Sequence, residues 1–179
     1  IGSDVGMISE DFMEIDKKYL TDTLISSLDI TSQNDIEQFK YDIFSKFDKY
    51  PDILINNSVI EIDHPDIDNN CDKKLDELMV EKWHRVIHEE LTSSLLLTKI
   101  FGYQMANAKG GVILNILSDV YLDPKGNLIN SMKNVNDIAL IALTNGLFGL
   151  TKYIATYWNE KNVRSNSLTI GAYKENSYV

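Results

Sequence analysis

Two side chains of this sequence have a spacing that could support acid–base chemistry. Tyr121 and Lys125 are four residues apart, and on a helix such residues share one face. An ammonium group beside a phenol lowers the phenol pKa, which makes the phenol usable as a general acid or base. Pro124 lies between the two residues, in a stretch that is typical of a loop. We therefore interpret this spacing as coincidence.

A histidine pair offers a second kind of chemistry. His84 and His88 stand four residues apart in a helical stretch, with Glu89 beside them, and these residue types can bind zinc. Two surface histidines on a charged helix explain the same pattern, and we predict no metal site. The acidic segment 61–68 lacks the ligand spacing and the central glycine of a calcium loop.

The composition is that of an ordinary globular protein. The chain has 179 residues, of which 44% are hydrophobic and 25% charged, and we expect one domain over 1–179. The net charge of −10 argues against nucleic acid or an anionic membrane as the main partner. The single cysteine, Cys71, cannot form an intramolecular disulfide. We see no apolar run of membrane-spanning length and no signal-peptide pattern, and we expect a cytoplasmic protein.

The hydrophobic pattern alternates between strands and helices. Short apolar runs predict strands, at 23–30, 53–55, 112–117 and 162–168. Helical periodicity predicts helices, at 3–20, 31–49, 75–88, 91–108 and 137–158, with a break near Glu89 and Glu90. Segments 61–74 and 121–136 are typical of loops. Alternation of this kind is typical of an α/β fold, a doubly wound parallel sheet with helices on both faces.

Several segments, taken in order, resemble the short-chain dehydrogenase/reductase family. The similar segments are Leu28–Thr31, Asp52–Ser58, Trp83–Thr92, Gly111–Ser118, the helix Ala139–Trp158 and Asn162–Gly171. Together they cover about residues 25–172. The run Leu150–Trp158 is also similar to members of bacterial surface-sugar and flagellin-glycan pathways. The resemblance implies a Rossmann-like sheet and NAD or NADP as the cofactor.

The resemblance also implies cofactor-binding positions, at Asp29, Ile30, Asn56, Ser58 and Gly171. Two of these positions have structural interpretations as well. Asp29 could contact adenine, or it could cap the helix that begins near Ser32. Asn56 and Asn57 could hold a ribose, or they could cap backbone groups at the end of a strand.

The catalytic set that the resemblance implies is largely replaced. The family's tyrosine and lysine, four residues apart on one helix, correspond to Leu140 and Thr144, and its asparagine corresponds to Glu90. Leucine carries no proton to transfer, and threonine carries no positive charge. Ser118 keeps the position of the catalytic serine, either as a hydrogen-bond donor to a carbonyl or as a relic.

The ends of the family pattern are incomplete in this sequence. Ile1 and Gly2 could be the tail of the glycine-rich turn that binds the pyrophosphate, in which case the first strand is missing and the second cannot be placed. The sequence also stops before the family's substrate-covering helices and last strand. The proline that precedes Gly171 in the family is Ile170 here.

The helix over 138–158 is apolar around most of its circumference. One face can pack on the sheet, and the remaining apolar surface needs a second cover. In the family this helix forms a bundle between subunits together with the helix near 91–108. We therefore expect a homo- or hetero-oligomer through helices 91–108 and 138–158.

Three functional hypotheses follow from these residues. The favoured one is a non-catalytic member of the family that acts as a structural or interaction partner. The alternative is a working NAD(P)-dependent oxidoreductase on a sugar-like or other small carbonyl or hydroxyl substrate, with Glu90 as a replacement acid or base. The third is a degraded product with no function of its own.

Overall fold

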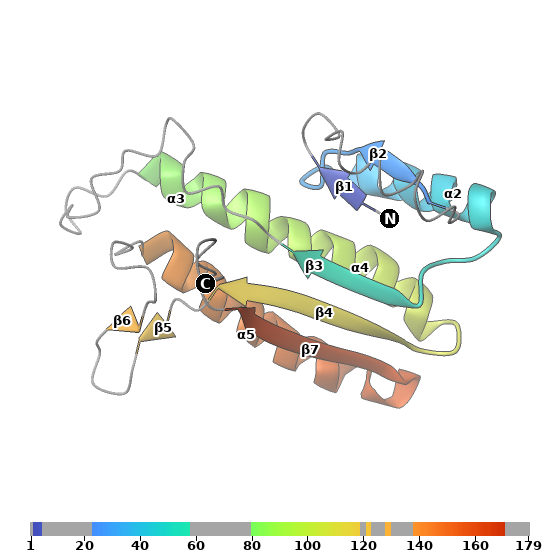
Figure 1. Cartoon of the computed structure of the whole chain (residues 1–179). Coiled ribbons are helices and arrows are strands. Elements are labelled where there is room, and N and C mark those ends of the chain that lie inside the picture. The colour runs from blue at the N-terminus through green and yellow to red at the C-terminus, as the bar shows by residue number, and fades with distance from the viewer. Residues whose placement is uncertain are drawn as a thin grey trace, which may run out of the picture.

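A computed structural model of the chain describes residues 2–4, 23–57, 80–118, 121–122, 128–129 and 138–170. Strands and helices alternate along most of this length (Figure 1). The N-terminal elements are β1 (Gly2–Asp4), β2 (Ile25–Ser27), α2 (Gln33–Phe47) and β3 (Ile53–Asn57). The later elements are α3 (Val80–Val86), η2 (Ile87–Thr92), α4 (Ser93–Ala106), β4 (Gly111–Ser118), β5 (Tyr121–Leu122), β6 (Leu128–Ile129), α5 (Ile138–Tyr157), η3 (Asn159–Lys161) and β7 (Val163–Ile170).

The strands are parallel, as the alternation with helices predicts. β4 is the central strand of a three-stranded sheet with the order β3-β4-β7, and β1 pairs with β2 in a second parallel pair. This arrangement confirms the doubly wound parallel, Rossmann-like fold. The described helices α2, α4 and α5 lie on one face of the sheet (Figure 1).

The core lies between the sheet and these helices. Alternate residues of β4 are buried against them, beginning with Ile113, and the first buried residue of β7 is Val163. Met105 of α4 and Ile154 of α5 pack against these two side chains from the helix layer. The two helices therefore cover neighbouring strands of one sheet face, as expected for short parallel crossovers.

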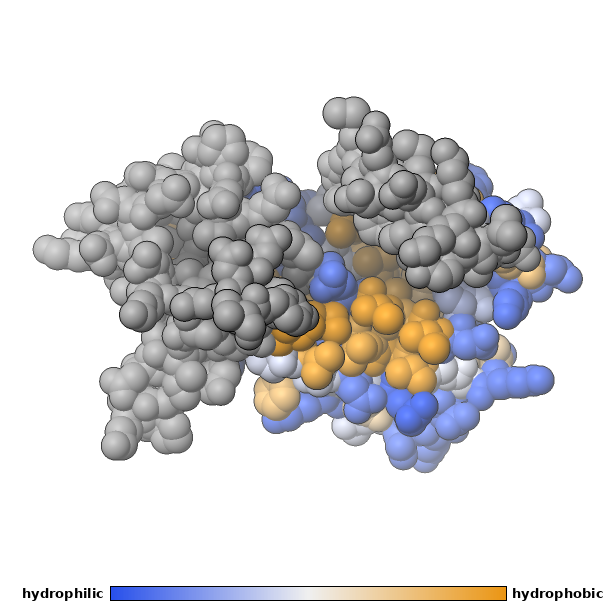
Figure 2. Space-filling view, in the orientation of Figure 1, coloured by the Kyte–Doolittle hydropathy of each residue, from blue (hydrophilic) through white to orange (hydrophobic). Residues whose placement is uncertain are grey.

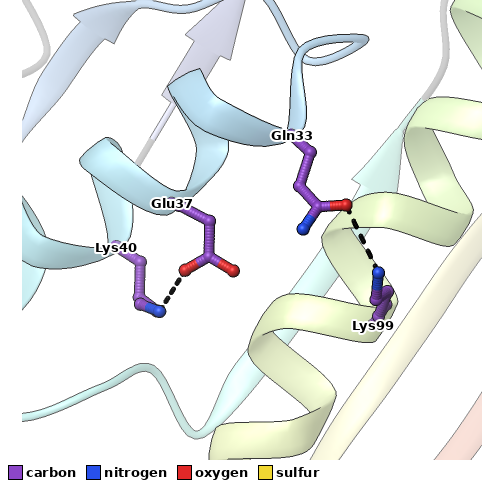
Figure 3. A network of polar contacts seen from close by, with 4 residues as sticks. All are labelled: Gln33, Glu37, Lys40 and Lys99. Carbon is purple, nitrogen blue, oxygen red and sulfur yellow. Dashed lines mark hydrogen bonds and ion pairs between the residues drawn. The ribbon is translucent and has the colours of Figure 1, made fainter.

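An N-terminal cap fixes the start of α2, and contact with α4 fixes its position. Ser32 accepts a hydrogen bond from the backbone N–H of Asp35, which satisfies one free donor of the first turn. Ile36 and Phe39 are buried against Ile100 and Phe101 of α4. At the edge of this contact Lys99 donates to Gln33 at 3.3 Å, and Lys40 pairs with Glu37 within α2 (Figure 3).

Helix 75–88 and helix 91–108 are joined through a π-helical segment. The predicted break near Glu89 and Glu90 falls inside η2, where Thr92 Oγ1 donates to the carbonyl oxygen of Ile87 five residues earlier. In the described part the first of these helices begins at Val80. A π segment widens the helix by one residue and occurs often at functional sites.

Three predictions about the chain's irregular parts are wrong. The segment 121–136 contains an antiparallel pair, β5 with β6, in place of a simple loop. The predicted helix over 3–20 is contradicted at its start, because Ser3 and Asp4 belong to β1. Gly2 is likewise part of β1 and pairs with Ile25, so it is not the tail of a turn, and a partner strand for β2 does exist. In each case a segment forms a strand because it pairs with residues elsewhere in the chain. Hydrophobic periodicity within the segment does not predict such pairing.

α5 is 20 residues long and, by length and composition, is the one helix in the described ranges that could cross a membrane. This corrects the expectation that no apolar run reaches that length. The same test is passed by core helices of soluble proteins. In this fold Leu143, Leu147 and Ile154 of α5 are buried in the core.

Candidate active site

Leu140 and Thr144 lie on one face of α5, and both are buried. Their exposed fractions are 8% and 7%. Leu140 packs in an apolar cluster with Val86 of α3 and Leu117 of β4. The position expected to present a catalytic phenol therefore holds a core side chain. Neither residue supplies a proton donor with an adjustable pKa or a cation.

Ser118 lies at the carboxyl end of β4, immediately after Leu117. Its backbone is opposite Ile170 of β7 in the parallel register. Leu117 packs in the cluster that contains Leu140, so the fold brings Ser118 and Leu140, the positions predicted to correspond to the family's serine and tyrosine, to the same part of the molecule. Tyr121 lies in β5, and Lys125 is outside the described residues.

Glu90 lies in η2 and is half-buried. Its backbone oxygen accepts a hydrogen bond from Ser93 Oγ at 3.1 Å, and the same hydroxyl donates to the carbonyl oxygen of Glu89 at 2.5 Å. Next to it, Leu91 packs closely on α5, since a Cβ atom added at Gly146 would lie 2.8 Å from a methyl carbon of Leu91. The π segment is thus held against the helix that carries Leu140 and Thr144.

A chain of buried polar side chains runs through the core beside these positions. Asn56 Nδ2 donates to Asn115 Oδ1 at 2.8 Å and to Thr98 Oγ1 at 3.2 Å. Asn115 Nδ2 donates to Thr151 Oγ1 at 2.8 Å, and Thr151 Oγ1 donates to the carbonyl oxygen of Leu147. The network joins α4, β3, β4 and α5. Sequence reasoning missed it, although a polar residue inside an apolar strand, Asn115, was its signal.

Asn56 therefore has its amide nitrogen engaged inside the core. The interpretation of this residue as a cap for backbone groups at the strand end is not what the contacts describe, because its partners are side chains. A direct contact of Asn56 with a ribose stays a prediction. Ser58 and Gly171, the other predicted contacts near this edge, lie outside the described residues.

Asp29 and Ile30 form the turn between β2 and α2. Asp29 Oδ1 accepts from the backbone N–H of Thr31 at 2.8 Å and from its hydroxyl at 2.6 Å. The hydroxyl hydrogen bond is the main reason that the pKa of Asp29 lies below its usual value, and the positive charge of His88 adds a minor contribution. The cap of α2 is Ser32, so the alternative in which Asp29 caps this helix is wrong.

The residues present fit part of a dinucleotide site. Dinucleotides bind outside the carboxyl ends of the strands in this kind of sheet. Asp29 follows β2 and Asn57 ends β3, and both side chains are exposed and polar. The residues after β1, where phosphate contacts belong, are outside the described part. The histidine pair gains no support as a metal site, because the described ranges contain no cluster of three potential ligands.

The parallel strand order and the helices packed on the sheet define a Rossmann-like fold of the dinucleotide-binding type. The family model of the short chain dehydrogenases matches residues 10–177, and the chain belongs to this family.

Known relatives agree with this assignment. The short chain dehydrogenase/reductase dpfgG of Gibberella zeae is 33% identical over 150 residues, which are 83% of this chain and 50% of that protein. A short-chain dehydrogenase/reductase of Burkholderia xenovorans has a similar solved structure, with a TM-score of 0.76 at 22% identity over 95% of this chain and 58% of its own.

The structure of L-sorbose reductase from Gluconobacter frateurii, complexed with NADPH and L-sorbose, is also similar. Its TM-score is 0.71 at 18% identity, over 93% of this chain and 57% of that one. The similarity to these two solved structures supports the fold alone, because the sequence identities are only 22% and 18%. The chain spans about half the length of the curated relatives that it matches. NAD or NADP is the cofactor that the family resemblance supports.

Proposed function

We propose that this chain uses the short-chain dehydrogenase/reductase fold without hydride-transfer chemistry and acts as a structural or interaction partner. One observation carries the proposal. Leu140, at the position of the family's tyrosine, is buried in an apolar cluster with Val86 and Leu117. A carbonyl placed there would meet methyl groups and no acid.

Thr144 supports the same conclusion. A lysine at this position would assist the phenol through its positive charge, and a threonine hydroxyl has no charge at neutral pH. Thr144 is buried, so its environment suits a neutral side chain. Both halves of the acid–base pair are thus replaced by side chains that suit a core.

Enzyme assays test this part of the proposal. Purified protein is given NADH or NADPH with L-sorbose and a panel of other sugar carbonyls, and nicotinamide absorbance is followed. We expect no turnover by the unaltered protein. Turnover that disappears in Glu90→Gln and persists in Glu89→Gln would overturn the proposal. The neighbouring carboxylate Glu89 is the matched control, because it is exposed on the same segment.

The outer faces of α4 and α5 support a role in assembly. Large apolar or aromatic side chains stand exposed on both helices, namely Leu95, Tyr103, Phe148, Tyr153 and Tyr157. Tyr153 and Tyr157 stack with their ring centroids 5.6 Å apart, which makes a flat aromatic surface one turn long. Aromatic side chains at this density are typical of the core of a protein interface. We propose that a second copy of this chain packs on this surface.

Sedimentation velocity tests the assembly. Tyr153→Glu with Tyr157→Glu places charges on the stacked surface, and we expect this double variant to sediment as a monomer while the unaltered chain forms dimers. Tyr41→Glu is the matched control, since Tyr41 is equally exposed but lies on α2. A monomeric unaltered protein contradicts self-assembly, and dimers that survive the double variant contradict this surface.

A working oxidoreductase is the second candidate, and the place of Glu90 favours it. The carboxylate belongs to a half-buried π segment that packs on α5. Partial burial can bring a carboxylic acid into a useful range for proton transfer. NAD(P) would supply the hydride, and a sugar-like carbonyl of the kind bound by the L-sorbose reductase is the natural first substrate to try. The Glu90→Gln assay above separates the two candidates.

A further inference from the structure

The exposed side chains of α4 (Ser93–Ala106) and α5 (Ile138–Tyr157) make up the α4–α5 surface, and its only charges are positive. α4 contains one charged residue, Lys99, and α5 contains one, Lys152. Both lysines are exposed. Neither helix contains an aspartate or a glutamate, although the whole chain has a net charge of −10. The α4–α5 surface is therefore opposite in charge to the chain as a whole.

Neither lysine forms an ion pair with a carboxylate of the described residues. Lys99 Nζ donates to Gln33 Oε1 at 3.3 Å, and this acceptor belongs to an uncharged amide (Figure 3). Lys152 Nζ lies 4.1 Å from the centroid of the Phe148 ring, which attracts a cation but carries no net charge. Each lysine thus keeps a full positive charge that a carboxylate of a partner can compensate.

Both lysines stand among the exposed apolar side chains of the same helices. Leu95 and Tyr103 lie four residues before and after Lys99, so the three share one side of α4. On α5, Lys152 comes four residues after the exposed Phe148. A partner that covers these apolar side chains also covers the lysines, and burying a charge without a counter-charge is costly. The lysines therefore bear on which partner fits.

A second copy of the chain offers no counter-charge from these two helices. An isologous pair brings the same patch from both chains, so it contains four lysines and no carboxylate from α4 or α5. The nearest carboxylate after Lys152 in the sequence belongs to Glu160, which lies in η3 beyond the end of α5. The nearest one before Lys99 belongs to Glu90, in η2 ahead of α4. The apolar side chains of two copies thus match, and their charges repel.

Exposed apolar area by itself does not identify a partner for this surface. The strands also expose large apolar side chains, on the sheet face away from these helices (Figure 2). They are Ile53, Ile55, Leu168 and Ile170. What distinguishes the α4–α5 surface is its pair of lysines, because charge complementarity discriminates between partners of similar shape.

We propose that the α4–α5 surface selects a partner protein that presents an apolar helix pair with carboxylates opposite Lys99 and Lys152. Such a partner covers the apolar side chains as a second copy does, and it adds opposite charges where a second copy adds like charges. The pair of identical chains is then the weaker of the two assemblies. This inference rests on the assembly surface of the proposed function and adds the chemistry of the favoured partner.

A charge-reversed copy of the chain serves as the probe partner. Lys99→Glu with Lys152→Glu keeps both helices and their apolar side chains and supplies the carboxylates. This copy is mixed in equal amount with the isotope-labelled unaltered chain, and native mass spectrometry counts the homodimers and the heterodimers. Lys46→Glu with Lys49→Glu is the matched control, because these exposed lysines lie at the end of α2 and the change in net charge is the same.

We expect heterodimers with the charge-reversed copy to exceed their statistical share at least about fivefold at low salt, and the excess to shrink as salt screens the charges. The control copy should mix statistically. A statistical mixture with the charge-reversed copy overturns this inference and leaves the self-assembly standing. Heterodimers without homodimers of the unaltered chain support the inference and overturn the self-assembly. The absence of every dimer overturns both.

The neutral variant Lys99→Gln with Lys152→Gln gives an independent check by sedimentation velocity. It removes the like charges of the symmetric pair, so it should self-associate about fivefold more tightly than the unaltered chain. Thermal unfolding of each variant alone reports that it is folded, as expected for changes at exposed positions. Self-association of the neutral variant that is equal to or weaker than that of the unaltered chain overturns the inference.

Discussion

Asn56 and Asn115 lie directly opposite each other in the register of β3 and β4, and the Nδ2 atom of the first donates to the Oδ1 atom of the second at 2.8 Å. Both side chains are buried. The pair links the two strands on the helix-covered face and connects to Thr98 on one side and Thr151 on the other. A connected polar path thus crosses the core between the sheet and the helices.

Replacing Asn115 with leucine should lower the free energy of unfolding by about 1–3 kcal/mol, because Asn56 loses a buried partner. Urea unfolding at equilibrium measures the change. Asn166→Leu is the matched control in the neighbouring strand, where the side chain is exposed, and it should have an effect within about 0.5 kcal/mol. Similar effects of the two variants would contradict a stabilising network.

Leu140→Ala should destabilise the protein by about 2–5 kcal/mol, because it opens a cavity between α5, α3 and β4. Thermal and urea unfolding give the magnitude. Phe148→Ala, on the exposed side of the same helix, should cost much less. A small effect of Leu140→Ala would show that position 140 is not part of the core, and the main support for a non-catalytic role would be lost.

Two glycines of α5 should respond differently to alanine. A Cβ atom at Gly149 meets nothing within 4 Å, so Gly149→Ala should stabilise the helix by up to about 1 kcal/mol. A Cβ atom at Gly146 comes within 2.8 Å of Leu91, so Gly146→Ala should forfeit this gain or reverse it. Unfolding free energies of both variants make the comparison. The additional change Leu91→Ala should remove the difference, and its persistence would contradict the steric explanation.

The stability contributed by Asp29 should depend on pH. Hydrogen bonds from Thr31 hold the pKa of Asp29 below its usual value in the folded protein. The folded state therefore favours the carboxylate, and the contribution is fully present above the unfolded pKa of about 3.9 and is lost as pH falls through the folded pKa. Asp29→Asn should lower stability at neutral pH and have a shrinking effect in acid.

Urea unfolding of Asp29→Asn and of the unaltered protein across this pH range tests the prediction. Thr31→Val removes the hydroxyl donor and leaves the backbone donor in place, so it should reduce the pH dependence. An Asp29→Asn effect of the same size at every pH would contradict the assignment of the shift to these hydrogen bonds.

Local sequence patterns were enough to predict several of the helices and strands of this protein. The apolar period of 31–49 predicted α2, in which Ile36 and Phe39 are buried, although its cap is Ser32 and not Asp29. The apolar run of 112–117 predicted β4, and the helix break expected near Glu89 and Glu90 falls in the π segment η2, whose π-helical form was not predicted. These features depend on interactions between residues that are close in the chain. The local sequence is therefore enough to predict them.

The tertiary structure decided what depends on partners far along the chain. β1 is a strand because Gly2–Asp4 pair with Ile25–Ser27, more than twenty residues away. Leu140 is a core residue because Val86 and Leu117 pack against it. Asn56 is buried beside Thr98 and Asn115, which accept hydrogen bonds from it and belong to other elements. The sequence alone predicted that Leu140 stands at the position of the family's tyrosine. That Leu140 lies in an apolar core follows only from the packing of elements that the chain brings together.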